Sequence, residues 1–191
     1  FDGAGITLLH NPRTFFVVGS GGKSAVVAPG AIDLVALPSR DFGGSMAAPA
    51  ASGILSATSG SVIALGTTDG LVYCVDGSLK DLPGFPVSVG GEIHNSPALA
   101  DMDGDGQKDI IVFSGNKIYA INPAGVILDN FPITVATGTG ILTSPIVADL
   151  DGNGTQDVVA VTQEGLVVAY DKTGKLVRGF PLQSGINNGS T

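Results

Sequence analysis

The chain has 191 residues, of which 43% are hydrophobic and 14% charged, and its formal net charge is −8. The nine Lys and Arg residues are scattered singly, which argues against a nucleic-acid partner because phosphate backbones are bound by clustered basic side chains. Membrane insertion is not expected either, because no apolar run approaches the roughly 20 residues that a membrane-spanning helix needs.

The first 45 residues contain three short apolar segments that are typical of β-strands. They are TFFVVGS at 14–20, KSAVVAPG at 23–30 and IDLVALPS at 32–39. With 29 Gly and 11 Pro in the chain, and no long amphipathic pattern, these segments indicate an all-β fold. They form a faint copy of a unit that recurs three times later in the chain.

A second motif overlaps this region. Residues 26–53, VVAPGAIDLVALPSRDFGGSMAAPAASG, resemble the nucleophile segment of subtilisin-like serine proteases, in which Ser45 would be the nucleophile. Gly44 and Ala50 stand where that family commonly has Thr and His, and only His10 precedes Ser45. The upstream residues are too few for the family's α/β scaffold, so we predict no catalytic residue. A remnant or C-terminal part of such a protease, fused to propeller repeats, stays the alternative.

The second copy of the unit spans residues 46–94. Its segment GILSATSGSVIALGTTDG, at 53–70, predicts a β-hairpin, where a protease would continue with a long helix. The single cysteine, Cys74, lies within the apolar run GLVYCVDG. One cysteine excludes an internal disulfide, and its apolar surroundings predict a buried structural thiol.

The third copy, residues 95–143, has the clearest strand pattern. Its four predicted strands lie at about 97–101, 110–114, 117–122 and 126–134, separated by turns rich in Asp, Gly and Pro. The acidic loop DMDGDGQKD, at 101–109, joins the first two. The fourth copy, residues 144–191, repeats this loop as DLDGNGTQD at 149–157.

Fixed anchors show that the copies are true repeats. Pro49, Pro97 and Pro145 are 48 residues apart, and Phe85-Pro86, Phe131-Pro132 and Phe180-Pro181 follow with similar steps. Four antiparallel strands in about 48 residues are typical of one blade of a β-propeller. We therefore predict a single propeller module whose blades are approximately 1–45, 46–94, 95–143 and 144–191, either closed or part of a larger ring.

The two acidic loops predict two calcium sites. Closely spaced carboxylates repel one another without a cation, and Ca²⁺ takes six to eight oxygen ligands in a flexible, Gly-bent loop. The corresponding positions of the second copy, Gly53, Leu55, Ala57 and Ser61, carry no carboxylate and predict a neutral turn. The predicted ligands, with backbone oxygens at Gln107 and Thr155, are Asp101, Asp103, Asp105, Gln107 and Asp109, and Asp149, Asp151, Asn153, Thr155 and Asp157.

These loops are not EF-hands, because position 12 holds Val112 or Ala160 in place of the required Glu. Together with the strands that follow them, they resemble the FG-GAP (VCBS-type) repeats of integrin α-subunit propellers and of many secreted bacterial proteins. The resemblance covers residues 95–191 well and 46–94 in degenerate form. It implies a calcium-bound β-propeller that is secreted or displayed at the cell surface.

The expected function is that of a binding, adhesion or assembly module, and not of an enzyme. The partner would be a protein or a carbohydrate. Two bound calcium ions would change the formal charge from −8 to −4, which favours association into a homo-oligomer or filament.

Overall fold

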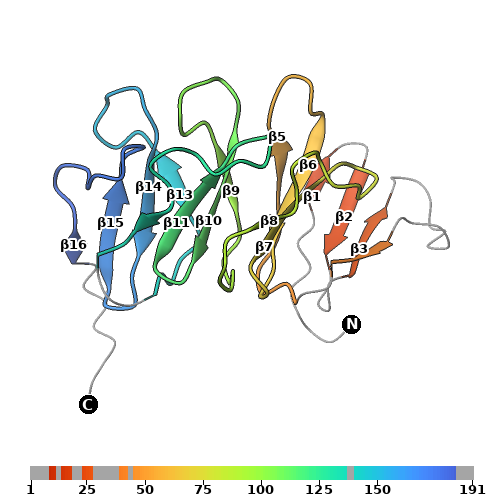
Figure 1. Cartoon of the computed structure of the whole chain (residues 1–191), viewed down its shortest axis with the longest axis horizontal. Coiled ribbons are helices and arrows are strands. Elements are labelled where there is room, and N and C mark those ends of the chain that lie inside the picture. Colours follow the sequence, from red (N-terminus) through yellow and green to blue (C-terminus); the bar gives the residue numbers. More distant parts are fainter. Residues whose placement is uncertain are drawn as a thin grey trace, which may run out of the picture.

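The computed structural model describes residues 9–11, 14–18, 23–27, 39–42, 45–136 and 140–183, with side chains from Arg40 onward. Its strands form four sheets of four antiparallel strands each, here called blades 1 to 4 (Figure 1). Blade 1 contains β1 (Leu9–Asn11), β2 (Thr14–Val18), β3 (Lys23–Val27) and β4 (Ser39–Asp41), and blade 2 contains β5 (Ala51–Ile54), β6 (Ser61–Gly66), β7 (Leu71–Val75) and β8 (Val87–Ser88). Blade 3 contains β9 (Ala98–Ala100), β10 (Asp109–Ser114), β11 (Lys117–Ile121) and β12 (Ile133–Thr134), and blade 4 contains β13 (Ile146–Ala148), β14 (Asp157–Val161), β15 (Leu166–Tyr170) and β16 (Leu182–Gln183). The predicted all-β class is confirmed.

The strands of each blade pair in chain order, so every blade is a simple meander. The blades stand side by side in chain order, with blade 1 at one end of the row and blade 4 at the other (Figure 1). The first strands β5, β9 and β13 contact one another across neighbouring blades. They therefore form the inner side of the row, as the first strands do in a propeller. No helix long and apolar enough to cross a membrane occurs among the described residues.

Consecutive apolar residues form the blades because each inner blade is covered on both faces. Along β10, Ile110 and Val112 pack against blade 2, whereas Ile111 and Phe113 pack against blade 4. Side chains alternate between the faces of a strand, so a run such as IIVF supplies both interfaces at once. Cys74 on β7 lies fully buried between blades 2 and 3, as predicted for a structural thiol.

The backbones of blades 2 and 3 meet closely at their outer loops. A Cβ atom on Gly84 would lie 2.0 Å from the carbonyl oxygen of Ala124, and one on Gly125 would lie 2.4 Å from that of Gly84. Both glycines also have positive φ angles, of 87° and 77°. Glycine is required here for two reasons: the left-handed backbone and the absence of room for a side chain.

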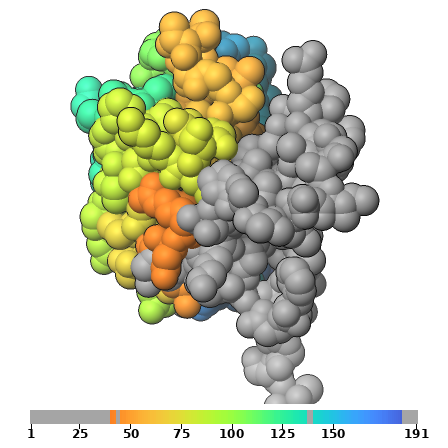
Figure 2. Space-filling model, turned by 90° about the vertical axis from the view of Figure 1, so that its right-hand side faces the viewer, coloured from red at the N-terminus to blue at the C-terminus, as the bar shows by residue number. Residues whose placement is uncertain are grey.

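Blade 1 is fastened to blade 2 by Arg40, the middle residue of β4. Arg40 donates two hydrogen bonds to the carboxylate of Asp81, at 2.7 and 2.8 Å, and a third to the Leu79 carbonyl. Its guanidinium lies 4.8 Å from the ring centre of Phe42 and 5.3 Å from that of Tyr73. Figure 2 shows this segment, in orange, against the surface of blade 2. A bidentate ion pair stacked on aromatic rings is among the stronger contacts available to Arg.

The segment after Ser45 contains the β5–β6 hairpin, as predicted from the repeat, and not the helix expected of a protease. Ser45 itself is exposed, and its carbonyl accepts a hydrogen bond from Thr68. Gly44 and the side chain of His10 lie outside the described residues.

The fourth strand of blade 3 is shorter than predicted. The sequence suggested 126–134, but β12 covers only Ile133–Thr134. The Asn122 side chain accepts hydrogen bonds from the N–H groups of Ala124 and Val126, and this side-chain-capped turn takes the place of extended strand.

Candidate metal centre

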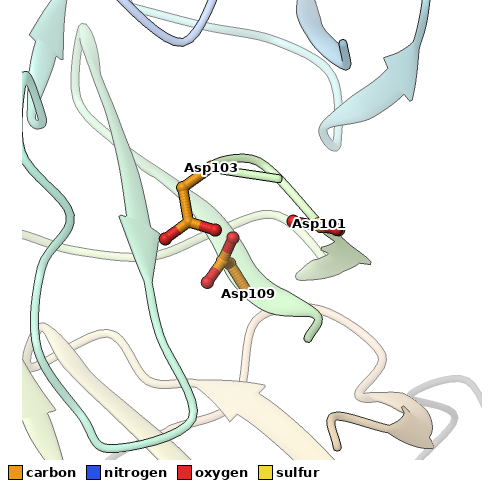
Figure 3. Close-up of side chains that lie close together, drawn as sticks. All are labelled: Asp101, Asp103 and Asp109. Atoms are coloured by element: carbon orange, nitrogen blue, oxygen red, sulfur yellow. The ribbon is translucent and has the colours of Figure 1, made fainter. Parts of the chain in front are cut away.

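The loop of residues 101–109 joins β9 to β10 and gathers three carboxylates. Oxygen atoms of Asp101, Asp103 and Asp109 all lie within 4.8 Å of one another. Figure 3 shows the carboxylates of Asp103 and Asp109 pointing toward each other, with Asp101 beside them. Asp109 is the first residue of β10 and is buried, whereas Asp103 is exposed at the loop tip. The cluster therefore opens to solvent on one side and rests on the sheet on the other.

Backbone N–H groups hold these carboxylates in place. Gly104 and Gly106 donate to Asp101 at 2.7 and 2.9 Å, and Met102 donates to Asp109 at 2.8 Å. Gly104 and Gly106 have φ angles of 86° and 84°, so the loop can coil tightly enough to direct its N–H groups inward. These bonds fix the positions of the oxygens and leave further lone pairs free for a cation.

The loop of residues 149–157 repeats this geometry in blade 4. Oxygens of Asp149, Asp151 and Asp157 lie within 4.8 Å of one another, and Gly152 and Gly154 both donate to Asp149 at 2.8 Å. Two loops in phase with the repeat thus place three carboxylates in the same arrangement.

One buried side-chain oxygen in the second loop lacks a hydrogen-bond donor. Asp157 is fully buried, and its Oδ2 atom accepts a bond from Leu150 at 3.0 Å, but its Oδ1 atom has no partner. An unpaired buried carboxylate oxygen is costly unless a cation satisfies it. Because this residue belongs to the carboxylate cluster, the unpaired oxygen supports a cation-binding role for the loop.

The buried carboxylate of each loop has a raised pKa, chiefly because of its burial. Burial raises the pKa of Asp109 to about 7; the Met102 N–H lowers it, while the carboxylates of Asp103, Asp105 and Asp101 raise it. The pKa of Asp157 is raised by burial and, more weakly, by Asp151 and Asp149. A bound divalent cation would reverse this repulsion, since it becomes the largest local charge.

Asp105 lies outside the three-carboxylate cluster of its loop, and the predicted roles of Gln107, Asn153 and Thr155 as ligands stay predictions. Asp105 accepts hydrogen bonds from the backbone N–H and the side-chain amide of Gln107, at 2.7 and 2.8 Å. Asn153 accepts bonds from the backbone and hydroxyl of Thr155. The first, third and ninth loop positions therefore converge, whereas the fifth position bonds to the seventh.

A lysine beside the first loop was not predicted from the sequence. Lys172 of blade 4 donates to the carbonyl oxygen of Asp103 at 3.0 Å, and its own carbonyl accepts a bond of 3.5 Å from the Asn130 side chain. These contacts tie blade 4 to the loop of blade 3. No signal in the sequence pairs residues so far apart in the chain.

The corresponding loop of blade 2 shows how the same turn closes without carboxylates. Ser59 accepts hydrogen bonds from the N–H groups of Leu55 and Ser56, at 3.2 and 3.0 Å. A hydroxyl group thus caps this turn in place of carboxylates, and no acidic cluster occurs there within the described chain. The neutral turn predicted for this copy agrees with this arrangement.

No family model and no curated protein matches this chain. Among solved structures, it is similar to the computationally designed Ika8 protein, with a TM-score of 0.62 and 13% identity over 90% of this chain and 47% of that one. It is also similar to BBS1N crystallised in complex with ARL6DN (TM-score 0.61, 11% identity, 91% of this chain and 52% of that one). A third is BamB from Moraxella catarrhalis (TM-score 0.60, 14% identity, 90% of this chain and 46% of that one). The fold is a β-propeller.

The chain spans about half the length of the solved structures that it matches. At these identities the likeness concerns the fold alone. The resemblance to FG-GAP repeats and the resemblance to subtilisin-like proteases both stay predictions.

Proposed function

We propose that this chain is part of an extracellular β-propeller whose last two blades bind calcium, and that it serves as a binding or assembly module and not as an enzyme. The observation that carries the proposal is the buried, unpaired Oδ1 atom of Asp157 in a carboxylate cluster that recurs one blade earlier. Both clusters offer only oxygen, the ligand that Ca²⁺ prefers.

The oxygens of each cluster are close enough for one ion to contact all three. They lie within 4.8 Å of one another, and ligands at about 2.4 Å from an ion can be up to about 4.8 Å apart. Three carboxylates leave several positions for water and backbone oxygens, which Ca²⁺ accepts in its flexible shell of six to eight ligands. Mg²⁺ demands near-octahedral geometry and gives up its water reluctantly, so we expect it to bind more weakly here.

Calcium would stabilise the folded chain by mass action. At an ion concentration ten times the Kd, each site adds about 1.4 kcal/mol to the free energy of unfolding, and two sites add about 3 kcal/mol. Extracellular modules bind calcium with Kd values of about 0.1 to 1 mM, so these sites suit a calcium-rich exterior.

The partner surface that we propose lies at the end of blade 3 opposite its acidic loop. The hairpin at 114–117 and the segment 89–94 form an open cleft of about 390 Å³ there. Gly91 allows the close approach, because a Cβ atom on it would lie 2.7 Å from the Ser114 hydroxyl. The cleft is lined by polar groups that suit a protein or carbohydrate surface, among them Glu92, His94, Ser114, Asn116 and Lys117.

The test is thermal unfolding in millimolar calcium and in excess chelator, with native mass spectrometry to count bound ions. We expect two ions per chain and a midpoint that rises by roughly 6–12 °C at a calcium concentration ten times the Kd, since 1 kcal/mol shifts a chain of this size by about 2–4 °C. Magnesium at the same concentration should give a smaller rise. A chain that binds no calcium and unfolds at one temperature in both buffers would contradict the calcium proposal.

A further inference from the structure

The second acidic loop contains an Asn-Gly pair, Asn153 and Gly154, and both residues are exposed. Asn side chains are chemically labile, because the backbone nitrogen of the next residue can attack the carbon of the side-chain amide. Glycine in that next position has no side chain to hinder the attack. A Cβ atom on Gly154 would meet nothing within 4 Å, so the space around it is open. These features point to deamidation of Asn153.

Deamidation of this pair would consume one water molecule and release one ammonia molecule. First, the Gly154 nitrogen forms a bond to Cγ of Asn153, and the bond from Cγ to the side-chain nitrogen breaks. The side-chain nitrogen leaves as ammonia together with the proton of the Gly154 N–H. Water then opens the resulting cyclic imide at either of its carbonyl groups and gives aspartate or isoaspartate at position 153. The reaction needs no oxidant and no reactant other than water.

Hydrogen bonds in the loop hold both reacting groups back. The Gly154 N–H donates to Oδ2 of Asp149 at 2.8 Å, so the electron pair that must attack Asn153 is directed toward Asp149. Oδ1 of Asn153 accepts bonds from the backbone N–H and the hydroxyl group of Thr155. The loop must therefore open locally and release these bonds before the reaction can occur.

The first acidic loop shows that the aspartate product fits the closed loop. Asp105 occupies the position of Asn153. Its Oδ1 atom accepts the backbone N–H of Gln107 at 2.7 Å, and Oδ1 of Asn153 accepts the backbone N–H of Thr155 at the same distance. In both loops the glycine that follows donates to the first aspartate of the loop, at 2.9 and 2.8 Å. Deamidation to aspartate thus gives the second loop the fifth-position carboxylate of the first.

We propose that Asn153 is a deamidation site in the folded protein, and that opening of the loop of residues 149–157 controls its rate. The calcium dependence of this rate rests on the function proposed above, because an ion that binds only the closed loop lowers the population of the open loop. At an ion concentration ten times the Kd, deamidation should be about tenfold slower than in chelator.

The two products affect the loop in opposite ways. Aspartate adds a negative charge beside the carboxylate cluster, and calcium loops bind more tightly as the charge of their ligands increases. Conversion to aspartate therefore strengthens the site. Isoaspartate lengthens the backbone by one carbon atom, which shifts the glycine relative to Asp149 and weakens the site. Asn153→Asp reproduces the first product and should bind calcium more tightly than the wild type in titration calorimetry.

The test is incubation of the full 191-residue chain at pH 8, in calcium and in chelator, followed by peptide mapping with mass spectrometry. A synthetic peptide of residues 149–157 is the reference, because it has the reacting pair without the blade. We expect the peptide to react fastest, the chain in chelator more slowly, and the chain in calcium most slowly. Asn153→Gln is the matched variant: it keeps an amide but must form a larger ring, so the mass gain of this segment should disappear. Peptide mapping measures the other Asn-Gly pair, at 188–189, separately.

The rates and the ion counts separate this proposal from that of calcium binding. An unmodified Asn153 in chelator, once the peptide has reacted fully, would overturn the proposal, and so would equal rates in the chain and in the peptide. Native mass spectra of the same samples count the bound calcium ions. If no ion binds and Asn153 still reacts more slowly than the peptide, the calcium proposal fails and the deamidation site stands. Two bound ions with equal rates in both buffers would overturn control by loop opening.

Discussion

Replacing Asp157 by Asn should change stability in opposite ways with and without calcium. In chelator, the amide oxygen can still accept the Leu150 N–H bond, and the substitution removes a buried charge beside Asp149 and Asp151. The free energy of unfolding should therefore stay the same or rise. In calcium, the variant loses a ligand, so it should lose about 1.4 kcal/mol of stabilisation at an ion concentration ten times the wild-type Kd.

The assay is urea denaturation of both proteins in calcium and in chelator, followed by circular dichroism. Asp76→Asn is the control: the Asp76 carboxylate accepts backbone N–H bonds from Ser78 and Lys80, as that of Asp157 accepts one from Leu150, but it lies outside the acidic loops. Its effect should be equal in the two buffers. If Asp157→Asn destabilised the chain equally in both, the carboxylate would be a structural group and the cation argument would be refuted.

Three further substitutions or modifications test the fold. Arg40→Met should cost about 1–2 kcal/mol of unfolding free energy and loosen blade 1, measured by denaturation and limited proteolysis, because an ion pair and two ring contacts are lost. Gly84→Ala should destabilise the chain by more than about 2 kcal/mol through its clash with Ala124, whereas Gly77→Ala, with open space around it, should be nearly neutral. Cys74 should resist alkylation at pH 8 until the chain unfolds, since burial raises the pKa of its thiol to about 12 and keeps it protonated.

The blade architecture could be predicted because each copy of the repeat has residues that mark where its strands begin. Pro97 and Pro145 precede the inner strands, and the apolar runs that follow the acidic loops become β10 and β14. Strand ends were less predictable. The fourth strand of blade 3 begins at Ile133 because the Asn122 side chain organises a turn ahead of it, and apolar residues such as Val126 do not reveal that turn.

Part of the loop geometry could also be predicted from the sequence. Carboxylates at the first, third and ninth loop positions converge because the glycines between them coil the loop. Asp105 instead accepts hydrogen bonds from Gln107. The spacing of the loop residues does not show whether the Asp105 carboxylate faces the cluster or bonds to Gln107. The contact from Lys172 depends on how two blades pack, and such long-range geometry leaves no pattern in one sequence.

Blade 2 shows that the loop between the first two strands of a blade can close without carboxylates. Its loop is closed by the Ser59 hydroxyl, and the blade is packed on both faces, against blade 1 through Ile63 and Leu65 and against blade 3 through Val62 and Ala64. Blade 4 has a packed neighbour on one face only among the described residues. Blade 3 is packed on both faces and still has an acidic loop, so packing alone does not decide which blades carry one; in blade 4, an ion that tied strand β13 to β14 would add to a sheet with fewer apolar contacts. In the first acidic loop the ion would also fix the Asp103 carbonyl that accepts the Lys172 bond, so that its effect extends to the contact between blades 3 and 4.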